Sequence, residues 1–316
     1  MNDSIYHFCT IASSDYLPFA KALAGSLLEQ HSCTCLHVLV VDNSARAAEN
    51  DCLFYSLNDI GQSPEAELII RKYADDNDAL RWALKPVFLR HLLQHEEKLF
   101  YADNDLFFFS AFLFLFEMLD NNSLVLSPHW CSFDPENQNE NFQMNFLLGL
   151  FNAGLIGVSK DAGTFLDWWA KACLHNMSRK TAEGYFVDQR YLDAALILHP
   201  STGVIRNLGC NLGSWNMHQN KRTKVAGQVL INGRFPVVCI HFNNETIKHI
   251  ANGNDPLLLP YLKQFEKAIS NAGGNLYQAK KNVASLEKAR AGKNLKQRLR
   301  LRTRLKAWLL YLSKKL

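Results

Sequence analysis

The stretch that decides the fold is "YHFCTIASSDYLPFAKALAGSLLEQ" (6–30), followed by "CLHVLVVDN" (35–43). The first begins as a short apolar segment, passes through a polar turn, and continues with apolar residues spaced three and four apart, which is helical spacing. The second is a continuous apolar run that ends in Asp42 and Asn43, as buried parallel strands commonly do. Strand, helix and strand predict the start of a doubly wound α/β sheet.

Polar residues follow both strands of this predicted sheet. Ligands of open α/β sheets bind beyond the carboxyl ends of the strands. Thr10 and Ser13 lie at the end of the first strand, and Asp42 and Asn43 at the end of the second. These four residues are therefore candidate nucleotide contacts.

A third strand with two aspartates at its end follows a predicted helix. "ALRWALKPVFLRHLLQHEE" (79–97) has helical spacing with a break before Pro86, and "KLFYADNDLFFF" (98–109) comes next. Asp103 and Asp105 would project from one face of an extended segment, because alternate side chains point the same way. Adjacent carboxylates repel unless a cation lies between them. The pair predicts a metal site, although solvated strand ends also carry such pairs.

The remaining apolar segments predict further core elements. "FLLGLFNAGLIGVSK" (146–160) is typical of a buried strand region, and "AGTFLDWWAKACLHN" (162–176) of a helix whose Trp168 and Trp169 pack inward. The most apolar stretch, "LFFFSAFLFLFEML" (106–119), has 14 residues. Because a membrane-spanning helix needs roughly 20, we interpret this stretch as core.

Charge is distributed unevenly along the 316 residues, whose formal net charge is +4. Residues 288–316 contain 11 Lys or Arg and no acid, which leaves 23 basic and 30 acidic groups in residues 1–287. An acidic body argues against nucleic-acid binding. A Gly/Asn-rich stretch at 271–275 predicts a boundary between a catalytic domain, 1–270, and a basic amphipathic helical tail, 271–316.

The tail combines cations with Leu, Trp and Tyr, which favours a helix in an anionic membrane interface. A solvated tail, a helix that packs on another subunit and an RNA-binding arm are the alternatives. The eight cysteines form no regularly spaced framework, and the first residues have neither the basic start nor the long apolar region that is typical of a signal peptide. We therefore expect a cytoplasmic protein that is peripheral at the inner face of the membrane.

Several of these segments resemble those of one enzyme class. The segment 98–109 resembles the metal-binding segment of GT-A glycosyltransferases. "FNAGLIGVS" (151–159), "YFVDQRYLD" (185–193) and "CIHFNN" (239–244) are similar to the Asn-Ala-Gly, Asp-Gln and late-histidine segments of the glycogenin and lipooligosaccharide galactosyltransferase type. A closer resemblance, over roughly 5–260, is to bacterial glycosyltransferases of polysaccharide gene clusters. It is carried by six motifs in the same order, at 84–86, 101–105, 165–169, 184–193, 211–218 and 241–243.

The resemblance implies a GT-A fold, which is Rossmann-like with a mostly parallel central sheet and flanking helices. It implies that Asp103, Asp105 and His241 bind Mn²⁺ or Mg²⁺, and that Asp188 and Gln189 are catalytic and grip the donor sugar. With the strand-end residues included, the predicted donor contacts are Thr10, Ser13, Asp42, Lys85, Asn104, Asn152, Ala153, Asn211, Trp215 and Asn216.

Structural alternatives exist for several of these residues. His241 and Trp215 are also compatible with the core, and Lys85 with a helix cap or the surface. Asn152 is compatible with a buried turn, and Asp188 with an ordinary helix N-terminus.

The implied reaction moves a hexose of the galactose or glucose type from a UDP-sugar to a lipid-linked or growing bacterial surface polysaccharide, such as O-antigen, lipopolysaccharide or capsule. Retention of configuration is favoured. Inversion stays open because "HFNNETIKHIANG" departs from the Gly and Lys-Pro-Trp that follow the late histidine in the glycogenin type. The alternatives are a metal-dependent phosphohydrolase that uses the Asp-x-Asp pair and a noncatalytic membrane adaptor. We expect no nucleic-acid partner.

Overall fold

The structure is a computed structural model that describes residues 5–42, 52–61 and 63–276. Asn43 and nearly all of the predicted tail, 271–316, lie outside the described residues. The expectations for Asn43 and for a membrane-binding tail therefore stay predictions.

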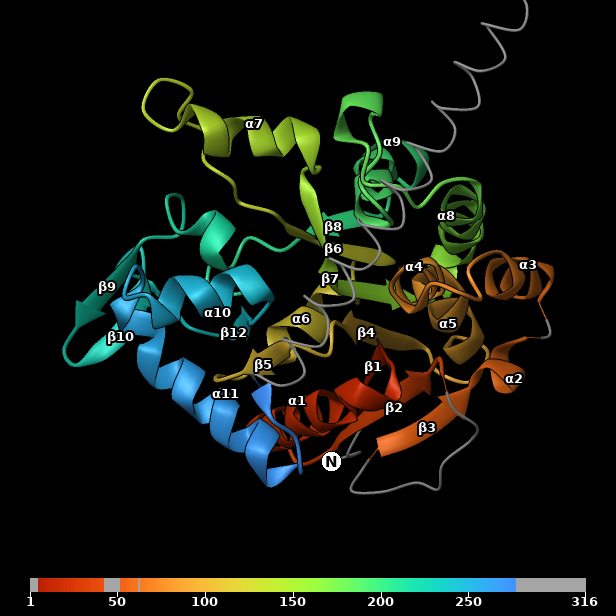
Figure 1. The fold of residues 1–316 in the computed structure, drawn as a ribbon, viewed down its shortest axis with the longest axis horizontal. Coiled ribbons are helices and arrows are strands. Elements are labelled where there is room, and N and C mark those ends of the chain that lie inside the picture. The colour runs from red at the N-terminus through yellow and green to blue at the C-terminus, as the bar shows by residue number, and fades with distance from the viewer. Residues whose placement is uncertain (1–4, 43–51, 62, 277–316) are drawn as a thin grey trace, which may run out of the picture. The chain divides into compact units, whose positions relative to one another are not determined.

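A seven-stranded sheet forms the centre of the described part (Figure 1). Its strands lie in the order β3 (Cys52–Ser56), β2 (Thr34–Val40), β1 (Tyr6–Ala12), β4 (Lys98–Ala102), β7 (Phe151–Ser159), β6 (Leu124–Pro128) and β8 (Thr202–Val204). Only β7 runs antiparallel to its neighbours, β4 and β6, while the other pairs are parallel. The predicted fold class, α/β with a mostly parallel sheet and flanking helices, is confirmed.

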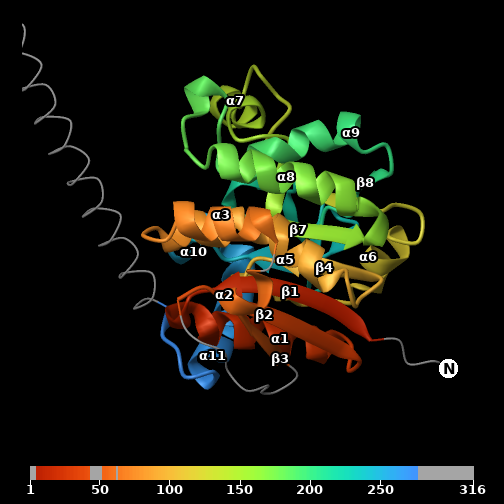
Figure 2. The same ribbon diagram turned by 90° about the vertical axis from the view of Figure 1, so that its right-hand side faces the viewer.

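Helices cover both faces of this sheet (Figures 1 and 2). One face packs against α2 (Leu57–Ile60), α3 (Pro64–Lys72), α4 (Asn77–Ala83), α5 (Lys85–Leu92) and α8 (Gly163–His175). The other face packs against α1 (Leu17–Gln30) and α6 (Leu113–Met118). Because strands such as β1 are buried from both sides, their sequences are continuous apolar runs and do not alternate with polar residues.

Aromatic residues fill the core on the second face. Phe8 of β1 has its ring centroid 5.0 Å from that of Phe112 and 5.6 Å from that of Phe108. Both partners come from the apolar stretch 106–119, which forms β5 (Leu106–Phe108) and α6. The prediction that this stretch is core is confirmed. Within the described residues, no helix is long and apolar enough to cross a membrane.

Two smaller sheets and the remaining helices extend from the central layer. Strand β5 pairs with β12 (Cys239–His241), and β9 (Arg222–Val225), β10 (Gln228–Ile231) and β11 (Phe235–Pro236) form a separate sheet. The other α-helices are α7 (Asn139–Leu147), α9 (Ala195–Leu198), α10 (Asn244–Ala251) and α11 (Leu259–Asn271). Short 3₁₀ helices are η1 (Ser14–Tyr16), η2 (Lys160–Ala162), η3 (Thr181–Glu183), η4 (Gln189–Ala194), η5 (Ser214–Asn216) and η6 (Pro256–Leu258). Helix α11 packs against α1 (Figures 1 and 2).

Most predicted element boundaries agree with the structure. The break before Pro86 is confirmed, since α4 ends at Ala83 and α5 begins at Lys85, with proline in its first turn, where no N–H is needed. The inward packing of Trp169 and, in part, Trp168 is also confirmed. The predicted strand region 146–160 is wrong at its start, where α7 ends and a turn at Gly149, with φ of +104°, precedes β7.

Candidate active site

The two aspartates of the Asp-x-Asp motif lie in a turn between β4 and β5. The prediction of an extended segment with both side chains on one face is therefore wrong in its backbone geometry. The Leu106 N–H donates to the Asp103 carbonyl over 2.9 Å and closes the turn, while the Asp103 N–H donates to the Gly154 carbonyl over 2.8 Å. Because β5 continues from the turn to pair with β12, the turn brings both carboxylates beside the end of β12.

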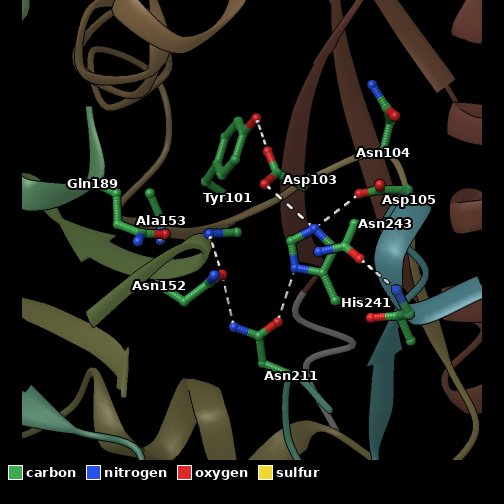
Figure 3. Close-up of polar contacts among 12 residues, drawn as sticks. Tyr101, Asp103, Asn104, Asp105, Asn152, Ala153, Gln189, Asn211, His241 and Asn243 are labelled. Atoms are coloured by element: carbon green, nitrogen blue, oxygen red, sulfur yellow. Dashed lines mark hydrogen bonds and ion pairs between the residues drawn. The ribbon is translucent and has the colours of Figure 1, made fainter. Parts of the chain in front are cut away.

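His241 is the last residue of β12 and lies opposite Leu106 in the β5–β12 pair. Its Nε2 is 3.0 Å from Asp105 Oδ1 and 3.8 Å from Asp103 Oδ2. Its other ring nitrogen, Nδ1, lies 3.1 Å from Asn211 Oδ1 (Figure 3). The side-chain carbonyl group of Asn211 thus fixes the imidazole ring of His241 so that Nε2 faces the two carboxylates.

Gly154 makes room for this imidazole. A Cβ atom at position 154 would lie 2.6 Å from His241 Cε1 and 2.7 Å from Asn152 Oδ1, which is closer than real Cβ contacts. The glycine of the segment "FNAG" is therefore required by the close packing of β7 against the histidine.

Asp103, Asp105 and His241 together could hold a metal ion. Their ligand atoms all lie within 4.8 Å of one another. The carboxylate side chains are 25% and 21% exposed, so an ion bound there would keep free positions for water or a substrate. Hard dications prefer such oxygen ligands, and an imidazole whose second nitrogen is held by an oxygen is typical of a metal ligand. The residues therefore fit Mn²⁺ or Mg²⁺.

The charges around this group favour a cationic histidine in the absence of a metal. Burial lowers the pKa of His241, but the carboxylates of Asp105 and Asp103 outweigh burial, so the pKa is raised overall. Tyr101 donates its hydroxyl hydrogen to Asp103 Oδ1 over 2.7 Å. Since that oxygen has a donor, Asp103 Oδ2 is the one directed at His241 (Figure 3).

Lys85 lies under the site and is only 2% exposed, so the surface alternative for this residue is wrong. Its Nζ is 3.1 Å from Asp103 Oδ1 and 3.1 Å from Asp188 Oδ2, and it donates to the Ala153 carbonyl over 3.0 Å. Burial lowers the pKa of Lys85, but the carboxylates of Asp103 and Asp188 more than offset this effect, and the pKa is raised. The ammonium group therefore stays charged between the two carboxylates.

Asp188 is also 2% exposed and precedes η4, but its side chain makes no cap hydrogen bond with that helix. Its burial raises its pKa, although the charge of Lys85 acts in the opposite direction. The structure thus pairs Asp188 with Lys85, and the helix-terminus alternative does not describe its contacts. The neighbouring Gln189 accepts from the Ala153 N–H over 3.2 Å and donates to the Leu148 carbonyl over 2.9 Å.

Three asparagines form a buried amide network next to His241. Asn211, with φ of +52°, donates from Nδ2 to Asn152 Oδ1 over 3.0 Å, and Asn216 donates to the Asn211 carbonyl over 3.0 Å. All three are less than 10% exposed. The ring of Trp215 meets that of His241 edge to face, with centroids 5.5 Å apart. These residues position the histidine and one another.

A hollow of about 230 Å³ opens beside the Asp-x-Asp turn. The sequence predicted four of the residues that line it, Asp103, Asn104, Asp105 and His241. It did not predict the other six, Ile11, Tyr16, Arg81, Trp82, Tyr101 and Asn243. Arg81 lies over the Tyr16 ring, 4.9 Å from its centroid, and donates to Ser13 Oγ over 3.0 Å. The position of Asn243 two residues after His241 was the available signal, whereas nothing local identifies Tyr16, Arg81 or Trp82.

The predicted nucleotide contacts occupy different places. Ser13 does not line the hollow but accepts a hydrogen bond from Arg81, which does. Asn104 lines the hollow and donates to the Ile11 carbonyl over 2.9 Å. Asp42 is exposed and accepts from the Ser14 N–H over 2.8 Å, which stabilises the turn after β1. Thr10 is fully buried inside β1 and is not among the residues that line the hollow.

The fold and the site define a mostly parallel α/β protein with a candidate dication site at the carboxyl edge of its sheet. No protein-family model matches the chain. The chain is 30% identical to the uncharacterized protein YfnF of Bacillus subtilis (strain 168) over 250 residues, which cover 77% of this chain and 82% of YfnF. It therefore belongs to the family of YfnF. The uncharacterized protein YfnD of the same strain is 27% identical over 258 residues, which cover 77% of this chain and 79% of YfnD.

The backbone is similar to that of several solved structures. One is mouse xyloside xylosyltransferase 1 in its apo form, with a TM-score of 0.48 and 15% sequence identity. The match covers 77% of this chain and 99% of the xylosyltransferase chain. Another is the galactosyltransferase LgtC with donor and acceptor sugar analogues, with a TM-score of 0.47, 18% identity, and coverage of 79% and 94%. The glycosyltransferase GlyE of Streptococcus pneumoniae TIGR4 matches with a TM-score of 0.37, 16% identity, and coverage of 65% and 46%.

Proposed function

We propose that this protein is a metal-dependent glycosyltransferase that moves a hexose from a UDP-hexose to a growing bacterial surface glycan. The observation that carries the proposal is the convergence of Asp103, Asp105 and His241 on one point beside an open hollow. Six motifs in the order found in bacterial polysaccharide glycosyltransferases support it from the sequence.

Asp103, Asp105 and His241 would hold Mn²⁺ or Mg²⁺ together with the donor diphosphate. Such an ion acts as a Lewis acid that neutralises charge on the departing nucleoside diphosphate. Asn211 keeps His241 Nε2 directed at the ion position, because it occupies the other ring nitrogen.

The hollow suits a nucleoside diphosphate. Tyr16 and Trp82 supply aromatic surface for a base, and Arg81 supplies a planar guanidinium that can meet phosphate oxygens. Ser13 and Asp42 lie on the same side, next to Arg81 and to the turn that follows β1. We assign these groups to donor binding, with Asn104 holding the Asp-x-Asp turn against β1 through its bond to Ile11.

Lys85 and Asp188 extend the proposed metal site into the buried core through a chain of contacts from Asp103. Lys85 offsets the charge of Asp103 and orients it, and Asp188 holds the Lys85 ammonium group in place. The burial of Asp188 favours this positioning role, and its direct contact with the donor sugar is the sequence-based expectation to be tested. Gln189 acts through the backbone of Ala153, which it holds beside Asn152.

The acceptor is proposed to be carried on a lipid, since the tail is strongly basic and contains Trp308 and Tyr311. Such a tail would hold the enzyme at an anionic membrane surface, near an acceptor anchored in the same bilayer. This part of the proposal depends on the sequence alone.

The test is turnover of UDP-hexoses with Mn²⁺ in the wild-type protein and in Asp105→Asn. We expect the variant to fold normally and to lose transfer, because a neutral amide is a poorer ligand for a hard dication. Asp120→Asn, which changes an exposed acid that pairs with Lys98, is the matched control and should keep full activity. Full activity of Asp105→Asn in excess EDTA would contradict the assignment.

Product analysis distinguishes transfer from the phosphohydrolase alternative. A transferase releases UDP and a glycosylated acceptor or, without acceptor, UDP and free sugar. A phosphohydrolase that hydrolyses the diphosphate bond of UDP-hexose releases UMP and hexose 1-phosphate. These two compounds as the main products would replace the proposed function by that alternative.

A further inference from the structure

A second group of metal-ligand side chains lies at the opposite end of the strands from the candidate active site. His7 is the second residue of β1, Cys35 is the second residue of β2, and His37 follows two residues later. The two strands are parallel and in register, with His7 beside Cys35. Cys35 and His37 are two positions apart in β2, so their side chains project from the same face of the sheet. Because Cys35 is paired with His7, the His7 side chain projects from that face as well.

The donor atoms of the three side chains meet on that face. One ligand atom from each of His7, Cys35 and His37 lies within 4.8 Å of the other two. His7 Nδ1 and His37 Nε2 are 3.0 Å apart. Two imidazole nitrogens on one tetrahedral Zn²⁺ would be about 3.4 Å apart, given Zn–N bonds of about 2.0–2.1 Å. Shifts of a few tenths of an ångström would therefore open the pair for an ion.

The remaining nitrogen of each imidazole faces an oxygen atom. His7 Nε2 is 3.0 Å from Glu96 Oε2, and His37 Nδ1 is 2.9 Å from the Tyr55 hydroxyl. Metal-bound histidines characteristically donate their second ring N–H to such an oxygen, which fixes the tautomer and the ring orientation. Both rings thus direct their other nitrogen toward the same point as the cysteine sulfur.

We propose that His7, Cys35 and His37 form a second metal site, for a thiophilic transition-metal cation of the Zn²⁺ type, oriented by Glu96 and Tyr55. Two imidazoles and one thiolate match the ligand preference of Zn²⁺, whereas Mg²⁺ and Ca²⁺ prefer oxygen ligands. The side chains of His7 and Glu96 are 17% and 24% exposed, which provides an entry path and a fourth position for water.

The site joins four segments of the chain, since Tyr55 belongs to β3. It links β1 to β2, and through Glu96 it reaches the segment between α5 and β4. The Asp-x-Asp turn is at the other end of the sheet and contributes no ligand. The proposal is therefore independent of the proposed glycosyltransferase activity.

Co²⁺ binding to the Asp105→Asn protein tests the proposal, because that variant disables the other candidate cation site. A thiolate bound to tetrahedral Co²⁺ gives a near-ultraviolet charge-transfer band, and Zn²⁺ should displace Co²⁺ and remove it. We expect the band in Asp105→Asn and its loss in Asp105→Asn/Cys35→Ser. The matched control is Cys33→Ser in the same background, since Cys33 is outside the group and should be dispensable.

Glu96→Gln, in the same background, tests the orienting role. It should keep the band while raising the Zn²⁺ Kd roughly tenfold, as loss of an outer hydrogen-bond partner does. If Cys35→Ser does not fold by circular dichroism, His7→Gln replaces it and should raise the Zn²⁺ Kd at least as much. No thiolate band, a band that survives in Cys35→Ser, or an unchanged Kd in His7→Gln would overturn the proposal.

Discussion

Replacing the buried lysine, Lys85→Met, should destabilise the fold strongly. Lys85 and Asp188 are each 2% exposed and lie 3.1 Å apart, so the substitution leaves a carboxylate in the core without its cation. Breaking one partner of a buried ion pair costs about 3–5 kcal/mol. Asp103 is 25% exposed and keeps the Tyr101 hydroxyl, so its contribution to the loss should be small.

The double variant Lys85→Met/Asp188→Leu separates the effect of the unpaired charge on stability from the effect of side-chain packing. With both charges replaced by apolar side chains of similar size, most of the lost stability should return, because such replacements of buried pairs are often neutral or stabilising. The double variant should nevertheless lack transferase activity if Lys85 and Asp188 act as proposed. Stability and function would then be affected separately by the same two residues.

Urea unfolding followed by tryptophan fluorescence measures these changes, with the slope checked for constancy between variants. Lys180→Met is the matched control, since Lys180 and Glu183 form a pair at 2.9 Å with both side chains more than half exposed. That control should change stability by less than about 0.5 kcal/mol. A loss under about 1 kcal/mol for Lys85→Met, or no recovery in the double variant, would refute the reasoning.

Three further predictions concern the histidines and the tail. Gly154→Ala should weaken Mn²⁺ binding by roughly tenfold or more in calorimetry, because the added Cβ would displace the His241 ring. The control, Gly25→Ala, has open space around its Cβ and should leave Mn²⁺ binding unchanged. Burial lowers the pKa of His129 to about 4, so the native state binds fewer protons than the unfolded state between pH 4 and 6.5. Stability should therefore fall by about 2 kcal/mol from pH 7 to pH 5 through this residue, and His129→Gln should show that much less pH dependence in urea titrations. A chain that ends at Gly274 should stay folded yet lose cosedimentation with anionic vesicles, since each Lys or Arg at such a surface contributes about 1 kcal/mol of binding free energy. Equal pelleting of the full-length and shortened chains would exclude the tail as an anchor.

The alternation of strands and helices could be predicted because it depends on local patterns. The apolar run of β2 and the spacing of α1 each encode their own element, and Pro86 marks the break between α4 and α5. The antiparallel direction of β7 could not be predicted, since a strand buried on both faces has the same composition in either direction.

The site was predictable where one segment carries the signal and not where distant segments meet. Asp103 and Asp105 are close in sequence, so their proximity followed even though the backbone is a turn and not a strand. Arg81 and Tyr16 come from α4 and η1, and no local pattern relates them. The prediction that Thr10 contacts the nucleotide is an error of the opposite kind, because it included a residue that the structure buries. A residue near a strand end can still point into the core.

The contacts of Lys85 also predict how substitutions in the site will combine. Its ammonium group contacts the Asp103 carboxylate, the Asp188 carboxylate and the Ala153 carbonyl at once. Ala153 is in turn held by Gln189, so the Asp-x-Asp turn, β7 and η4 share one buried cation. Residues in one such network have non-additive effects, since the first substitution already removes what the second would remove. Variants of Asp188 and Lys85 should therefore be compared through the double variant.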